Sequence, residues 1–228
     1  MRKLIEGIVN FREQVLPQYE EHFRRLSQGQ TPDALFITCS DSRVVPDLLM
    51  STDPGDLFVM RNVGNLIPPA TIEGSSTGDL SEASAIEFSV LVLGVQSIVV
   101  CGHSECGAMK AAMERKPTSE TPNLNKWLHH CNTALFRLDQ EGPLNRALPA
   151  HDQLSQINVL VQLEHLMSYP IVRQRVHAGA LQLGGWWFDI AQARMLSYER
   201  ETRAFEPIDR RAAERLMQRL APAGTQEA

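Results

Sequence analysis

The chain has 228 residues, of which 43% are hydrophobic, and it carries a formal net charge of −5 at pH 7. A chain of this length and apolar content suits one domain with a sizeable core, so we expect residues 1–228 to form a single domain. The net negative charge, without any run of Lys and Arg, argues against a nucleic-acid-binding protein, because neutralising phosphates requires a basic surface.

The N-terminal part of the chain is predicted to begin with a helical arm and to continue with short buried strands. Residues 1–27 place apolar side chains on one face, which is typical of a helix, and Pro17 is expected to break or kink it. Three short apolar runs predict strands, at residues 34–38, 57–60 and 97–101. The most apolar stretch, 88–101, is too short and too interrupted by polar residues to cross a bilayer, so no membrane span is expected.

The remaining patterns predict helices and two late strands. The helices are expected at residues 82–93, 106–115, 124–138 and 154–167. The late strands are expected at residues 181–190 and 195–198, as edge strands, before a C-terminal helix and polar tail over 212–228. Strands that alternate with helices predict an α/β domain with a mainly parallel central sheet flanked by helices.

The four cysteines bear on the compartment and on the chemistry. The first residues carry basic side chains, but no apolar segment follows them. A signal peptide is therefore not expected, and we expect a cytoplasmic protein. In a reducing compartment cysteines are metal ligands or buried thiols more often than disulfides. Because no Cys-x-x-Cys motif occurs, a redox thiol protein is disfavoured.

Two polar patches each follow a predicted strand, at residues 39–43 and 101–107. The carboxyl ends of parallel strands share one edge of a sheet, so both patches are expected to face one crevice. Together they offer two thiols, an imidazole and a carboxylate, a donor set that suits zinc with one position open for water. Taken alone, Cys39 is equally well a small buried hydrophobe. An Asp and an Arg that follow it at regular spacing, Asp41 and Arg43, favour a metal site over core packing.

The other cysteines are interpreted as packing residues. Cys101 lies inside an apolar strand pattern, which favours a place in the core. Cys131 follows two histidines on a predicted helix, but adjacent helical residues point in different directions, so a second metal site is disfavoured there.

Residues 39–44, 61–65 and 101–108 resemble, in the same order, the signature segments of the β-class carbonic anhydrases, and residues 183–190 resemble the C-terminal strand of that family. The chain is most similar to bacterial and cyanobacterial members of a plant-like subtype. The resemblance implies an enzyme that reversibly hydrates carbon dioxide to bicarbonate and a proton. Such an enzyme is classed as a lyase and serves carbon utilization. The resemblance also implies one Zn²⁺ per chain, which carries the hydroxide that attacks carbon dioxide.

The resemblance assigns roles to the residues of both patches. Cys39, His103 and Cys106 match the three constant zinc ligands of the family. Asp41 matches an aspartate that binds zinc as a fourth ligand in a closed state, or pairs with Arg43 in an open state that leaves room for water. An arginine suits this second state because its guanidinium grips a carboxylate with two hydrogen bonds.

The substrate pocket is implied more indirectly. Gln30 matches a glutamine that reaches the substrate from the partner subunit, and Phe58, Val63 and Gly107 match positions around the substrate. Phe88 stands where plant-type members have a tyrosine. The family further implies a homodimer or a higher homo-oligomer, in which the arm formed by residues 1–27 embraces the partner.

Two other functions fit the same residues. One is a hydrolase of carbonyl sulfide or carbon disulfide, which would use identical zinc ligands. The other is a non-catalytic zinc scaffold in a carbon-concentrating compartment. For the location of the protein, a carboxysome is the alternative to the cytoplasm. A structural zinc site needs no Asp–Arg pair, which favours the enzyme.

Overall fold

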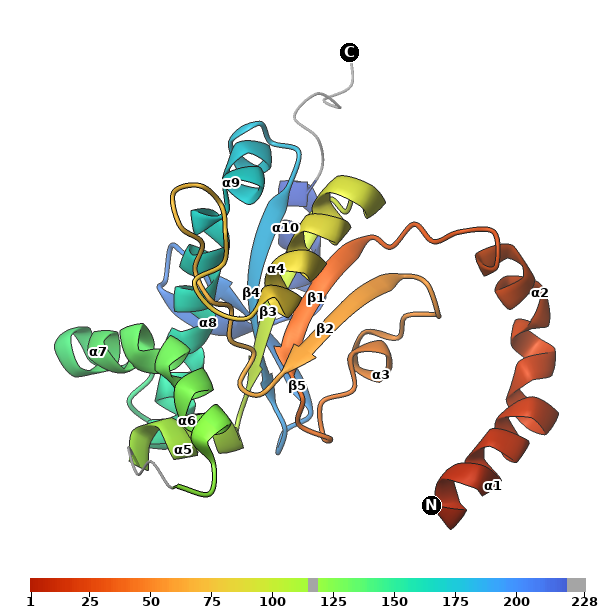
Figure 1. Cartoon of the computed structure of the whole chain (residues 1–228), viewed down its shortest axis with the longest axis horizontal. Helices are drawn as coiled ribbons and strands as arrows, with labels where there is room; N and C mark the ends of the chain where they lie inside the picture. The colour runs from red at the N-terminus through yellow and green to blue at the C-terminus, as the bar shows by residue number, and fades with distance from the viewer. Residues whose placement is uncertain (115–118, 221–228) are drawn as a thin grey trace.

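The computed structural model describes residues 1–114 and 119–220 and confirms the predicted α/β class (Figure 1). Its six-stranded sheet has the order β2-β1-β3-β4-β5-β6. The strands are β1 (Ala34–Cys39), β2 (Leu57–Asn62), β3 (Ser97–His103), β4 (Gln182–Asp189), β5 (Arg194–Glu199) and β6 (Ala204–Pro207). The first four strands in this order pair in parallel. β5 pairs antiparallel with β4, and β6 pairs antiparallel with β5 and forms one edge of the sheet.

The register of the parallel strands sets the position of the polar patches. Thr38 pairs with Arg61 on one side and with Cys101 on the other. Both β1 and β3 are buried along nearly their whole length, as their continuous apolar runs predict for central parallel strands. Cys39 and His103 are the last residues of these strands, so the register brings both to one edge of the sheet.

Helices cover the two faces of the sheet unequally. The helices beyond the N-terminal arm are α3 (Pro46–Met50), α4 (Leu80–Glu87), the π-helical η2 (Phe88–Leu93), α5 (Gly107–Glu114), α6 (Pro122–Trp127), the 3₁₀ helix η3 (Leu128–Cys131), α7 (Asn132–Glu141), α8 (Ala150–Ser168), α9 (Pro170–His177) and α10 (Arg210–Leu220). The main core lies under α4, its continuation η2, α8 and α9. A second cluster joins α8 to α5 and α7, and a smaller third cluster packs against the other face, where α3 contributes.

The N-terminal arm stands away from the sheet (Figure 1). It consists of α1 (Arg2–Asn10), the π-helical segment η1 (Phe11–Val15) and α2 (Leu16–Leu26). The helix therefore continues past Pro17, and the disturbance predicted at this residue takes the form of the π-helical turn before it. The apolar stripe of α1 is exposed, with Leu4, Ile5 and Ile8 each more than half accessible.

Some elements differ from the prediction. The strand predicted to end at residue 101 continues to His103, and α3, α9 and β6 were not predicted. The predicted C-terminal helix is α10, which starts two residues early, whereas the polar tail at 221–228 lies outside the described residues. None of the described helices is long and apolar enough to cross a membrane.

Candidate metal centre

Three elements bring the predicted zinc ligands together. Cys39 ends β1, His103 ends β3, and Cys106 immediately precedes α5. The sulfur atoms of the two cysteines and a ring nitrogen of His103 all lie within 4.8 Å of one another, and all three residues are buried. This group is therefore able to hold a metal ion.

The His103 ring is oriented towards this group. Its Nδ1 lies 2.8 Å from the Ser104 carbonyl oxygen, to which it donates, so Nε2 carries the free lone pair. Nε2 is buried and has no hydrogen-bond partner in the described part of the chain. A buried acceptor without a donor is unfavourable, and a metal ion at this position removes the deficit.

The two thiols favour a cation between them. A hydrogen bond from the Cys106 thiol, together with one from the Gly64 amide 3.3 Å away, outweighs burial and lowers the pKa of the Cys39 thiol well below its usual value. The same contact and burial raise the pKa of Cys106, because its ionisation would place two thiolates side by side. A divalent ion relieves that repulsion, and a donor set of two sulfurs and one imidazole fits zinc.

Asp41 lies beside the ligand group but is turned towards Arg43. The Arg43 guanidinium donates from Nε to Oδ1 at 2.9 Å and from a terminal nitrogen to Oδ2 at 2.7 Å. These bonds hold the pKa of Asp41 well below its usual range, so the carboxylate is ionised at neutral pH. Oδ2 remains 3.9 Å from Nε2 of His103. The carboxylate is thus adjacent to the ligand group while each of its oxygens accepts one hydrogen bond from the guanidinium, which leaves further acceptor capacity.

Backbone hydrogen bonds fix both ligand segments. Arg61, at the end of β2, donates to the carbonyl oxygens of Cys39 at 3.1 Å and Asp41 at 2.7 Å. On the other side, the Ser155 hydroxyl of α8 donates to the His103 carbonyl at 2.9 Å and accepts from the Trp187 indole at 3.0 Å. The sequence-based prediction did not include Ser155, because its role depends on where α8 lies in the fold.

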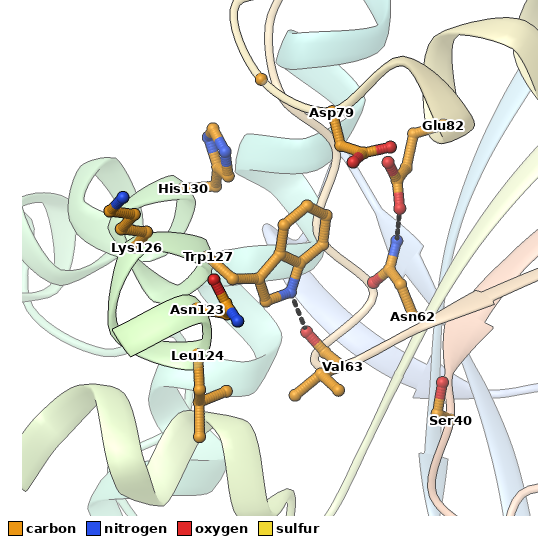
Figure 2. Close-up of a pocket in the computed structure, with 11 residues that line it drawn as sticks. Ser40, Asn62, Val63, Asp79, Glu82, Asn123, Leu124, Lys126, Trp127 and His130 are labelled. Carbon is orange, nitrogen blue, oxygen red and sulfur yellow. Dashed lines mark hydrogen bonds between the residues drawn. The ribbon is translucent and has the colours of Figure 1, made fainter. Parts of the chain in front are cut away.

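The predicted pocket residues separate into two groups. Val63 lines a cavity of about 740 Å³ between the end of β2, the start of α4 and α6 (Figure 2). The cavity reaches Ser40, next to Cys39, and its wall includes Trp127, whose indole donates to the Val63 carbonyl at 2.7 Å. Gly107, the first residue of α5, follows Cys106 directly.

The other three pocket residues are not part of this cavity. Phe58 and Phe88 contact each other, with ring centroids 5.8 Å apart, and Phe88 is 43% exposed. Gln30 is exposed in the segment between α2 and β1. Within one chain, the cavity that reaches Ser40 is therefore lined without Gln30, Phe58 and Phe88.

The remaining cysteines are placed as predicted. Cys101 and Cys131 are fully buried, and neither belongs to a potential ligand group among residues 1–114 and 119–220. A second cluster of ligand-type side chains, Glu105, His151 and Asp152, lies nearby, but Lys110 already pairs with Glu105.

The fold and this geometry define an α/β protein with a Cys-His-Cys metal-binding group at the carboxyl edge of a parallel sheet. The sequence profile described as "Carbonic anhydrase" matches residues 34–195. The chain belongs to the carbonic anhydrase family, in its β class, and is an enzyme of that family.

Individual relatives agree with this assignment. The chain is 40% identical over 215 residues to the carbonic anhydrase of Synechococcus elongatus, covering 92% of this chain and 75% of that protein. It is 40% identical over 205 residues to the carbonic anhydrase of Pseudomonas aeruginosa, covering 90% of each. The solved structure of the β-carbonic anhydrase CcaA superposes with a TM-score of 0.82 at 37% identity, over 91% of this chain and 98% of that one.

Proposed function

We propose that one zinc ion, held by Cys39, His103 and Cys106, enables this enzyme to hydrate carbon dioxide reversibly to bicarbonate and a proton. The observation that carries the proposal is the unpartnered Nε2 of His103, which lies beside two thiols in a buried group of ligand atoms. Zinc in such a site supplies Lewis acidity, which makes a water molecule a nucleophile at neutral pH.

The protein's own residues prepare the site for that chemistry. The Ser104 carbonyl fixes the His103 tautomer that leaves Nε2 free to bind. Arg43 holds Asp41 with two hydrogen bonds, which keeps the carboxylate from serving as a further ligand and leaves room for water. Ionised and adjacent to the ligand group, Asp41 is placed to accept a hydrogen bond from a water molecule there, which would orient the lone pair of that water towards carbon dioxide.

The pocket and the assembly belong to the same proposal. The exposed apolar stripe of α1 supports a homodimer or higher homo-oligomer in which the arm packs on the partner. The solved tetrameric β-carbonic anhydrases of Sordaria macrospora superpose with a TM-score of 0.73 at 28% identity, over 86% of this chain and 95% of that one. In such an assembly, Gln30 of one subunit would complete the pocket of the other beside Phe58 and Phe88.

The test is stopped-flow hydration of carbon dioxide against pH, with zinc determined on the same sample. About one zinc ion per chain and rapid hydration are expected for the wild type. Cys39→Ser is expected to lose both, whereas Cys131→Ser, at an equally buried cysteine outside the ligand group, is expected to retain both. Asp41→Ala is expected to keep zinc and lose most of the hydration.

Two outcomes would contradict the proposal. A protein that binds zinc but does not hydrate carbon dioxide between about pH 6 and 9 would direct attention to carbonyl sulfide and carbon disulfide hydrolysis. A protein inactive on all three substrates would leave a zinc scaffold. Equal zinc content in Cys39→Ser and Cys131→Ser would refute the ligand assignment itself.

A further inference from the structure

The loop between the proposed ligands His103 and Cys106 contains a residue in an unfavourable backbone conformation. Glu105 has φ of 58°, in the left-handed region that residues other than glycine rarely occupy. The conformation of this residue sets how the chain returns from the end of β3 to the start of α5. An interaction that holds Glu105 in place therefore also holds Cys106 relative to His103.

Both polar groups of the Glu105 backbone have partners. Its amide N–H donates to Oδ1 of Asp152 at 2.6 Å, and its carbonyl oxygen accepts from the Arg43 guanidinium at 3.1 Å. The same guanidinium nitrogen binds Oδ2 of Asp41. A continuous chain of contacts therefore runs from Asp152 through the Glu105 backbone to Arg43 and Asp41.

Asp152 is unusual for a residue outside the ligand group. It is the third residue of α8 and is only 4% exposed, although it is a carboxylate. Buried carboxylates are rare unless they are hydrogen-bonded, and its bond to the Glu105 amide is short. The Glu105 side chain, in contrast, is about half exposed and pairs with Lys110 and His151.

We propose that Asp152 is a positioning residue of the metal centre, which acts through the backbone of Glu105. By holding the Glu105 amide, Asp152 fixes the loop that carries His103 and Cys106. By fixing the Glu105 carbonyl, it also aims Arg43 at Asp41. The inference rests on the proposed zinc site, since it concerns how that site is held in shape.

The main experiment compares Asp152→Ala with Asp152→Asn in the full-length, zinc-loaded protein. Zinc affinity is measured by competition with a chelator, and carbon dioxide hydration is measured on zinc-saturated samples. Asp152→Ala is expected to weaken zinc binding by about 10–100-fold, the usual effect of removing a residue that orients a metal ligand. Asp152→Asn keeps an oxygen acceptor for the Glu105 amide, so its affinity is expected to stay close to that of the wild type.

A matched control and a coupling test separate positioning from helix stability. His151→Gln changes the neighbouring residue on α8, whose ring pairs with the side chains of Glu105 and Asp152 and not with the Glu105 backbone amide. This variant is expected to leave zinc affinity unchanged. Glycine adopts the left-handed conformation freely, so Glu105→Gly removes the need for the Asp152 bond. Asp152→Ala is therefore expected to weaken zinc binding several-fold less in the Glu105→Gly background.

The outcomes distinguish this inference from the function on which it rests. Wild-type protein that neither binds zinc nor hydrates carbon dioxide overturns both. An active wild type with the same zinc affinity in Asp152→Ala overturns only the positioning role. An equal loss in both backgrounds also overturns it, because Asp152 would then act on helix stability alone. If Asp152→Ala does not fold, Asp152→Asn and the double variant Glu105→Gly/Asp152→Ala still test the positioning role. A folded Asp152→Asn protein with weakened zinc binding would refute the role of Asp152 as a hydrogen-bond acceptor.

Discussion

Gly102, which immediately precedes His103 in β3, offers the sharpest test of the packing behind the metal centre. A Cβ at this position would lie 2.8 Å from Cγ2 of Val159, 3.2 Å from Oγ of Ser155 and 3.2 Å from Cδ1 of Trp187. All three side chains are buried, and Ser155 is bonded to both the His103 carbonyl and Trp187. Ser155 and Trp187 cannot move away without breaking these bonds, and Val159 is enclosed in the main core, so Gly102→Ala overpacks this site.

The expected loss of stability follows from the cost of adding one methyl group to this core. Adding a methyl group to a well-packed core destabilises a protein by about 1–3 kcal/mol. In a chain of this size each kcal/mol lowers the melting temperature by about 2–4 °C, so Gly102→Ala is expected to lower it by about 2–12 °C. Gly107→Ala is the matched control, because its Cβ meets nothing within 4 Å at the start of a helix. Calorimetry of both zinc-loaded variants measures the difference.

A substitution at Val159 tests the contact between this side chain and a Cβ at position 102. Val159→Ala removes the methyl group nearest to the added Cβ, so Gly102→Ala is expected to destabilise the Val159→Ala protein less than the wild type. Equal melting temperatures for Gly102→Ala and Gly107→Ala would refute the packing described here. So would strictly additive effects of the Gly102 and Val159 substitutions.

Three further predictions concern the thiols, the charge pair and the arm. Burial raises the pKa of Cys101 to about 12, so roughly one Cys101 thiol in ten thousand is ionised at pH 8. Peptide mapping should therefore show iodoacetamide labelling of Cys101 only after unfolding. Because Arg43 depresses the pKa of Asp41, this pair stabilises the fold above about pH 4 and progressively less below it. The stability advantage of the wild type over Arg43→Met in urea unfolding should therefore narrow below about pH 4. Light scattering should show a smaller assembly for Ile8→Glu than for Ile72→Glu, a control in an exposed loop.

The strands and the ligand group are the parts that sequence reasoning can predict best. Apolar runs ending in polar patches identify β1 and β3, because central parallel strands are buried on both faces. The rule that parallel strands share a carboxyl edge then brings Cys39 and His103 together before any coordinates are known. These signals are local in the chain or follow from topology alone.

The supporting residues could not be predicted in the same way. Asp152 and Ser155 look like ordinary polar residues in the first turns of a helix, and their partners lie 47 and 52 positions away in the sequence. Only the packing of α8 on β3 brings them to the loop. The short helix α3, with five residues, was missed for a different reason, because it completes too few turns to show a helical period.

The two parts of the proposed active site depend on different levels of structure. The ligand group is formed by β1, β3 and the start of α5, all within one chain, so a dissociated subunit should still bind zinc. Gln30, Phe58 and Phe88 do not line the cavity beside Ser40 within one chain, and Phe88 is 43% exposed. On our proposal these residues form a pocket only in the assembly. On our proposal the partner completes that pocket, so a dissociated Ile8→Glu protein should keep its zinc and lose hydration. A monomer with the hydration rate of the wild type would instead mean that the 740 Å³ cavity beside Val63 serves the substrate without a partner.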